Sequence, residues 1–187
     1  MEQAVMAPEG QIVAAPLAVP VARIGPRVGA AALGSALIVV GALLPWATVH
    51  GVGPIDSTWR GIATADGRIV LALGATALLA VAALGMGRSR RIAVAALALS
   101  SLAVAGLAIA AAVGADGRYP MLQIDRATAR FTSLTGFPFV GVRNRIIEAV
   151  LGHTHVSLGV GLVLVIAGAT VATAAALLQL RRGSATA

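Results

Sequence analysis

The chain has 187 residues, of which 58% are hydrophobic and 11% are charged, and it carries a net charge of +7 with no cysteine. A soluble domain has about 25% charged residues, so a soluble fold of this composition would lack the polar groups to cover its surface. The composition therefore predicts an integral membrane protein, and it excludes disulfides and cysteine-based metal sites. The basic residues are all arginines at the ends of apolar runs, a pattern that argues against nucleic-acid binding.

The first 27 residues are rich in Ala, Val and Pro and have no sustained period. We expect them to form a disordered cytoplasmic tail. They lack a basic stretch before an apolar core, so they do not resemble a cleavable signal peptide. The first membrane span is expected to act as an uncleaved signal anchor.

Four apolar runs without Asp, Glu, Lys, Arg or His follow the tail. Each is close to the roughly 20 residues that a helix needs to cross a hydrocarbon core of about 30 Å. The sequence predicts an all-α membrane protein, with a four-helix transmembrane bundle over residues 28–180 and a small extracytoplasmic cap. The expected spans are residues 28–47, 69–86, 92–113 and 156–180, followed by a cytoplasmic tail over 181–187.

The distribution of arginines predicts the orientation of the spans. Seven arginines lie in the 39 residues of the two tails and of the turn between the second and third spans. The expected outer loops, residues 48–68 and 114–155, also hold seven, but in 63 residues and offset by five acidic residues. Because arginine is enriched in cytoplasmic loops, both termini are expected in the cytoplasm of a plasma-membrane protein.

The first outer loop is expected to form a hairpin around Gly51-Val52-Gly53-Pro54. Trp46, directly after Pro45, fits an interfacial anchor whose indole N–H reaches water or a headgroup. Trp59 is expected to fold down onto the outer ends of the helices.

The tetrapeptide Ala-Asp-Gly-Arg occurs twice, at 65–68 before the second span and at 115–118 after the third. Asp66 is a candidate helix cap and Gly117 a candidate helix end. Arg68 and Arg118 are expected to reach headgroups or to pair with neighbouring acids such as Asp116. We interpret these four charged residues as part of the cap rather than as catalytic groups.

The second outer loop has no run long enough to span a membrane. Residues 143–152 place their apolar side chains on one helical face, which predicts a short helix on the membrane surface or on the hairpin. His153 and His155 in this loop have the spacing of a pair of metal ligands. His50 in the first loop is a candidate third ligand. Zinc or copper would suit such a set; a polar segment before the last span is the alternative interpretation.

Small residues recur on the faces of the first and fourth spans. They include Ala30, Gly34 and Gly41 in the first span and Gly161, Gly168 and Ala172 in the fourth. Such faces allow close helix approach. They predict packing inside the bundle or docking onto another membrane protein or a second copy of the chain.

Three features of the sequence occur together: Leu44-Pro45-Trp46 at the end of the first span, a short outer loop reaching Gly61-Ile62 and Asp66-Gly67, and a glycine-rich start of the last span at 158–162. In these features the chain resembles small four-span actinobacterial membrane proteins without an assigned activity. The topology is also similar to that of claudin-type tetraspans. The cysteines of that family are missing here, so the claudin function is not transferred.

The absence of ionisable residues in the spans argues against a proton relay or an ion-coupled transporter within one chain. We expect a non-enzymatic accessory or assembly partner in the cell envelope, without a cofactor, whose partners are the lipid bilayer and another membrane protein. An oligomeric transport or channel component is the alternative, and an outer-face metal-binding protein is a third hypothesis.

Overall fold

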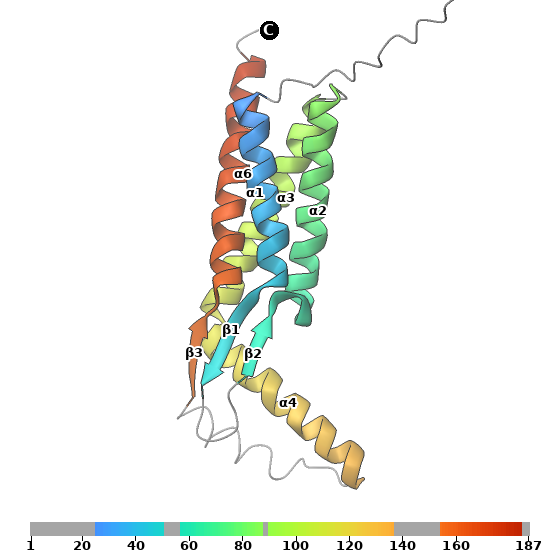
Figure 1. Ribbon diagram of the computed structural model, residues 1–187, viewed down its shortest axis with the longest axis vertical. Coiled ribbons are helices and arrows are strands. Elements are labelled where there is room, and N and C mark those ends of the chain that lie inside the picture. The colour runs from blue at the N-terminus through green and yellow to red at the C-terminus, as the bar shows by residue number, and fades with distance from the viewer. Residues whose placement is uncertain (1–24, 51–56, 88–89, 137–153, 185–187) are drawn as a thin grey trace, which may run out of the picture.

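The computed structural model describes residues 25–50, 57–87, 90–136 and 154–184. Four long helices run side by side as a bundle (Figure 1): α1 (Pro26–Leu43), α2 (Ala65–Gly85), α3 (Arg90–Val113) and α6 (Val160–Ser184). At one end lie the strands β1 (Pro45–His50), β2 (Ser57–Arg60) and β3 (His155–Leu158), the turn η1 (Gly61–Ala63) and the helix α4 (Ala115–Thr135). We call this group the cap, and we call the opposite end, where α1 begins and α6 ends, the terminal end.

Each of the four bundle helices is long and apolar enough to cross a membrane. Their outward faces carry large exposed apolar side chains, including Leu79 and Leu99, which are 72% and 70% exposed. The charged residues of the four helices lie in their first or last turns. The expected four-helix architecture is therefore confirmed, although the cap adds a sheet that an all-α fold does not have.

At two helix ends, residues of the expected spans belong to strands of the cap instead. α1 ends at Leu43 rather than at residue 47, since Leu44 precedes Pro45 and adopts an extended conformation with ψ 169°. At the other side of the sheet, α6 begins at Val160 rather than at residue 156, because residues 155–158 pair with β1 as β3.

The sheet has the order β2-β1-β3, and both neighbouring pairs are antiparallel. The hairpin expected in the first outer loop is confirmed as the pair of β1 and β2. Each strand adjoins a bundle helix: β1 follows α1, β2 leads through η1 to α2, and β3 leads to α6. The sheet therefore extends the bundle and fixes the ends of three helices relative to one another.

Close packing of α1 against α6 holds the bundle together. A Cβ atom added at Gly34 would lie 2.7 Å from the carbonyl oxygen of Gly168, and one added at Gly41 would lie 2.6 Å from the carbonyl oxygen of Gly161. The two backbones approach so closely that a side chain at these positions has no room. The small-residue faces found in the sequence are thus occupied inside the chain, on this pair of helices.

The helix termini around the cap differ in two places from the sequence-based expectation. The cap of α2 is Thr64, whose hydroxyl oxygen accepts a hydrogen bond from the backbone N–H of Gly67 at 3.1 Å, whereas Asp66 lies in the first turn. Gly117 does not end a helix but lies in the first turn of α4. The first half of the long outer loop is thus helical, and the helix expected at 143–152 lies outside the described residues.

Candidate functional site

The two faces of the cap sheet differ in chemistry. One face carries Ala47, Val49 and Trp59, which pack with Ala115 and Tyr119 of α4 into a small apolar cluster. The other face carries the polar side chains at the paired positions Thr48–Thr58, Thr48–Ser157 and His50–His155. This alternation follows from the period of two residues in a strand. The sheet is therefore attached to α4 by one face and presents polar groups on the other.

Trp46 differs from the expected headgroup-facing anchor. Pro45 pairs with Arg60 and Ala47 pairs with Trp59, so Trp46 is the extra residue of a β-bulge. Such a bulge redirects a side chain out of the normal alternation. The indole is fully buried in the main cluster of the bundle, and its N–H donates to the carbonyl oxygen of Gly41 at 2.9 Å. Trp46 is thus a core residue that joins the sheet to α1.

Trp59 connects β2 to α4. Trp59 is 4% exposed, and the centre of its ring lies 6.3 Å from the ring centre of Tyr119. The guanidinium carbon of Arg126 lies over the Trp59 ring, 4.0 Å from the centre of that ring. The indole N–H donates to the hydroxyl of Ser57 at 3.1 Å, and this hydroxyl donates to the side-chain oxygen of Gln123 at 2.8 Å. The cation–π contact and the hydrogen-bond chain both fix α4 against the sheet.

The two Ala-Asp-Gly-Arg repeats meet in space. Arg118 of the second repeat forms an ion pair with Asp66 of the first, so the start of α4 is tied to the start of α2. The hydrogen bond to Asp66 raises the pKa of Arg118 further above its ordinary value. Arg68 instead donates through Nε to the carbonyl oxygen of Thr64 at 3.4 Å, and Asp116 is exposed in the first turn of α4.

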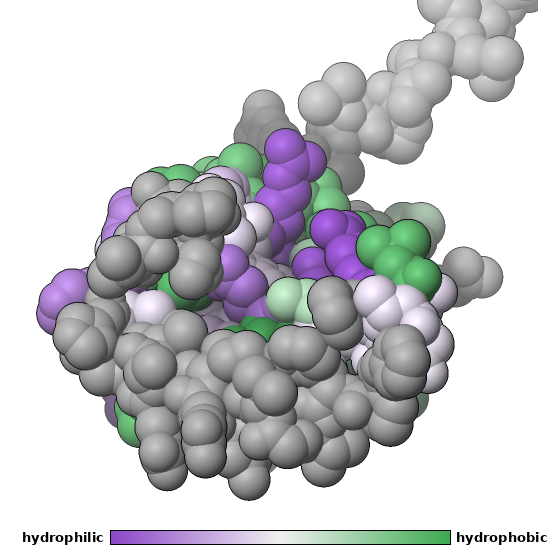
Figure 2. All heavy atoms as spheres, turned by 90° about the horizontal axis from the view of Figure 1, so that it is seen from below, coloured by the Kyte–Doolittle hydropathy of each residue, from purple (hydrophilic) through white to green (hydrophobic). Residues whose placement is uncertain are grey.

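A pocket of about 290 Å³ lies between β2 and α4. It is lined by Ser57, Trp59, Gln123, Arg126 and Arg130, among others, and the described residues that line it include no carboxylate. Viewed from the cap end, hydrophilic side chains are grouped on this face of the described residues (Figure 2). Among the residues that the structure describes, the hydroxyl of Ser57 is hydrogen-bonded to the side-chain amide of Gln123 and to the indole N–H of Trp59. The guanidinium groups of Arg126 and Arg130 suit the binding of an anionic or polar group.

Two of the three histidines occupy facing positions. His50 and His155 are paired across β1 and β3, and Nε2 of His50 lies 3.2 Å from the hydroxyl of Ser157. His153 lies outside the described residues. Among the residues that the structure describes, no three His, Asp or Glu side chains are grouped to hold a metal ion. The zinc or copper site therefore stays a prediction that rests on one facing pair.

The chain matches no protein-family model, no curated protein and no solved structure. Its function has to be inferred from the geometry of the cap and the bundle. Sequence reasoning identified Trp59, Asp66 and Arg118 as cap residues but missed Gln123, Arg126 and Arg130. The spacing of 123, 126 and 130 along a helical face was a usable signal, since positions three and four apart lie on one side of a helix.

Proposed function

We propose that this chain is a non-enzymatic accessory or assembly subunit of the plasma membrane, with both termini in the cytoplasm. Its bundle crosses the bilayer and its cap offers α4 to an extracytoplasmic region of a partner protein. The exposed apolar faces of the four bundle helices support insertion, since large exposed apolar surfaces mark contact with lipid or protein.

The observation that carries the proposal is the second half of α4. Its first half packs on the sheet through Ala115 and Tyr119, and Ile124 at the middle of the helix is also buried. Beyond Ile124 the helix extends away from the bundle (Figure 1), and its side chains are largely exposed, with Leu134 at 86%. A folded helix that leaves an apolar residue and arginines unburied is a surface for another molecule.

The chemistry of this helix favours a partner that supplies carboxylates. Arg126 and Arg130 are one helical turn apart and line the cap pocket together. Arginine at an exposed position forms bidentate hydrogen bonds with carboxylates, and it is enriched in protein interfaces. The glycine faces of α1 and α6 are already filled within the chain, so the cap is a better candidate for the contact than these faces.

Site-specific photo-crosslinking in intact cells tests this proposal. A photoreactive residue at Ala129, which is exposed on α4, should yield one defined protein adduct, whereas one at Leu79 on the outside of the bundle should yield lipid adducts. Arg130→Glu should abolish the protein adduct. The matched charge reversal Arg60→Glu, on exposed β2, should leave it in place.

The alternative functions give different outcomes. A channel component would purify as a homo-oligomer that conducts ions in liposomes, and its adducts at Ala129 would join two copies of this chain. A metal-binding protein would bind stoichiometric zinc or copper that is lost on His50→Ala or His155→Ala. Either result, or a monomer without protein adducts at Ala129, would refute the accessory assignment.

A further inference from the structure

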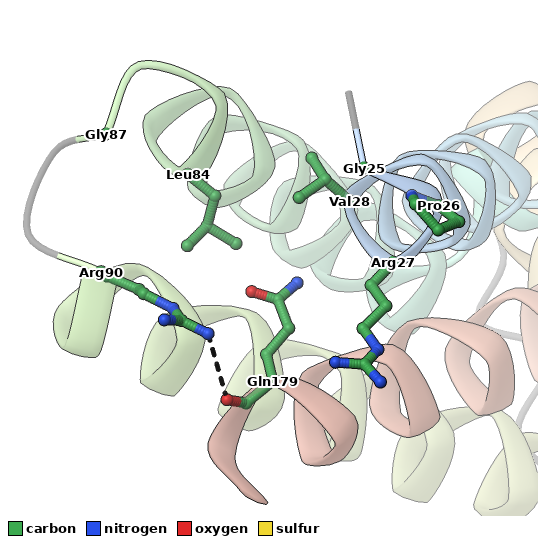
Figure 3. A pocket seen from close by; sticks show the side chains of 8 residues that line it. All are labelled: Gly25, Pro26, Arg27, Val28, Leu84, Gly87, Arg90 and Gln179. Atoms are coloured by element: carbon green, nitrogen blue, oxygen red, sulfur yellow. Dashed lines mark hydrogen bonds between the residues drawn. The ribbon is translucent and has the colours of Figure 1, made fainter. Parts of the chain in front are cut away.

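The terminal end of the bundle contains a pocket of about 420 Å³. It is lined by residues at the start of α1 and α3, at the end of α2 and near the end of α6. Arg27 of α1 and Arg90 of α3 stand on opposite sides of Gln179 of α6 (Figure 3). Val28 and Leu84 add apolar side chains to the same pocket. The pocket thus combines two cations with an apolar wall.

Gln179 has a polar group without a protein partner. Its side chain is only 6% exposed, and its amide nitrogen has no hydrogen-bond partner among the described residues. The side chain reaches into the space between the two arginines (Figure 3). Nearly all buried N–H groups in native proteins are hydrogen-bonded. We therefore expect a hydrogen-bond acceptor in the pocket to bind this nitrogen.

The positive charge of the terminal end also favours an anionic ligand. Arg90 donates through Nη2 to the backbone carbonyl oxygen of Gln179 at 3.5 Å, which uses one of its five N–H groups. The carboxylates that the structure describes are Asp66, Asp116 and Asp125, and all three lie on the start of α2 or on α4, at the cap end. Within the described ranges, no acidic side chain of the chain neutralises the pocket.

We propose that this pocket binds a phosphate group, held by Nε2 of Gln179 and by the guanidinium groups of Arg27 and Arg90. These groups are hydrogen-bond donors, and a phosphate has only acceptors to offer at its charged oxygens. The apolar side chains of Val28 and Leu84 favour a phosphate that carries a hydrophobic body. An anionic phospholipid headgroup meets both requirements, and basic pockets between membrane helices are suited to such headgroups.

Lipid binding to the full-length protein in neutral detergent tests the site. Phosphatidylglycerol should bind at least about tenfold more tightly than zwitterionic phosphatidylcholine, as measured by native mass spectrometry or thermal shift. Arg27→Gln and Arg90→Gln should each weaken phosphatidylglycerol binding about tenfold, as expected for the loss of a charge-assisted hydrogen bond. Arg91→Gln removes the same charge from the exposed neighbouring position outside the pocket, and should weaken binding less than threefold, roughly the effect of losing one general surface charge.

Gln179→Leu separates a ligand-binding role from a structural one. It removes a buried nitrogen that lacks a partner, so the ligand-free protein should unfold at the same or a higher temperature. Phosphatidylglycerol binding should nevertheless fall several-fold. A purely structural glutamine would give a lower unfolding temperature and unchanged lipid binding.

Inorganic phosphate distinguishes the two sources of the ligand. If it binds far more weakly than phosphatidylglycerol, the occupant is a lipid headgroup. If it binds as tightly and with the same dependence on Arg27, Arg90 and Gln179, the phosphate site holds but its ligand is a soluble phosphate. Equal binding of the two lipids, or equal effects of Arg90→Gln and Arg91→Gln, would overturn the proposal.

Discussion

At the scale of single residues, the cap shows how context decides the role of an aromatic side chain. Trp46 was expected at the membrane interface and Trp59 on the outer ends of the helices, and in the structure both rings are buried and both N–H groups donate within the protein. Trp46 enters the bundle because a bulge in β1 turns it away from the sheet. Trp59 is covered because α4 crosses the hairpin.

Tyr119 provides a pH-dependent test of the cap. Burial raises its pKa above the ordinary value of 10.0, Arg118 opposes this shift, and Asp66 adds to it. As pH rises past about 10, the unfolded chain loses the phenolic proton while the folded cap keeps it. The contribution of Tyr119 to stability is therefore complete below pH 10 and decreases as the pH rises toward its folded pKa.

The ultraviolet absorbance of tyrosinate measures this titration without ambiguity, since the chain has one tyrosine. The folded protein should titrate above pH 10, and the denatured protein should titrate near 10. Tyr119→Phe should remove the part of the alkaline loss of stability that belongs to this group. A folded midpoint at or below 10 would show that the Tyr119 ring of α4 is not buried against the sheet.

At the scale of elements, an alanine substitution is expected to destabilise the protein at Gly168, in the contact of α1 with α6, and to stabilise it at Gly106, outside this contact. A Cβ atom at Gly168 would lie 2.6 Å from the carbonyl oxygen of Gly34 and 3.0 Å from the backbone nitrogen of Ile38. Since backbone atoms cannot rotate away, Gly168→Ala should force the helices apart and cost about 1–3 kcal/mol. Gly106 of α3 has no atom within 4 Å of an added Cβ, so Gly106→Ala should stabilise by about 0.4–1 kcal/mol.

Thermal unfolding in one detergent, followed by tryptophan fluorescence, measures both variants. Trp46 belongs to the same buried cluster as Leu162 and Val165 of α6, so its emission reports on this contact. A neutral Gly168→Ala, or equal shifts from the two substitutions, would contradict the close approach of α1 and α6.

The elements that the sequence predicted are recognisable from local composition, whereas those that it did not predict depend on contacts with distant parts of the chain. The four bundle helices were predictable because unbroken apolar runs of about 20 residues have few other uses. β3 was not, because its four residues His155–Leu158 form a strand only by pairing with β1, more than 100 residues earlier. α4 was hidden by Pro120 and by its mixed polarity, since it is stabilised by burial of one face against the sheet.

The candidate site was predictable to a similar extent. The charged repeats pointed to Asp66 and Arg118, but only the fold shows that they pair with each other across 52 positions. The Gln179 pocket had no signal in the sequence. A lone glutamine in an apolar helix becomes informative only when its neighbours and its missing partner are known.

At the scale of the whole molecule, the proposed topology places the cap outside the cell and the terminal end in the cytoplasm. The arginines at both chain ends and between α2 and α3 favour this orientation. Because the chain has no cysteine, single introduced cysteines report on each region separately. Thr58 in the cap, Met86 at the terminal end and Leu79 on the bundle surface are all exposed positions.

A membrane-impermeant thiol reagent should label Thr58→Cys in intact cells and Met86→Cys only after the cells are opened. Leu79→Cys should resist the reagent in both states, because lipid rather than water would cover this side chain, which is 72% exposed in the isolated fold. The three positions separate two claims. Labelling of Met86→Cys but not Thr58→Cys in intact cells would reverse the orientation and move the cap to the cytoplasm. Ready labelling of Leu79→Cys would instead show that the bundle is not embedded in lipid at this face.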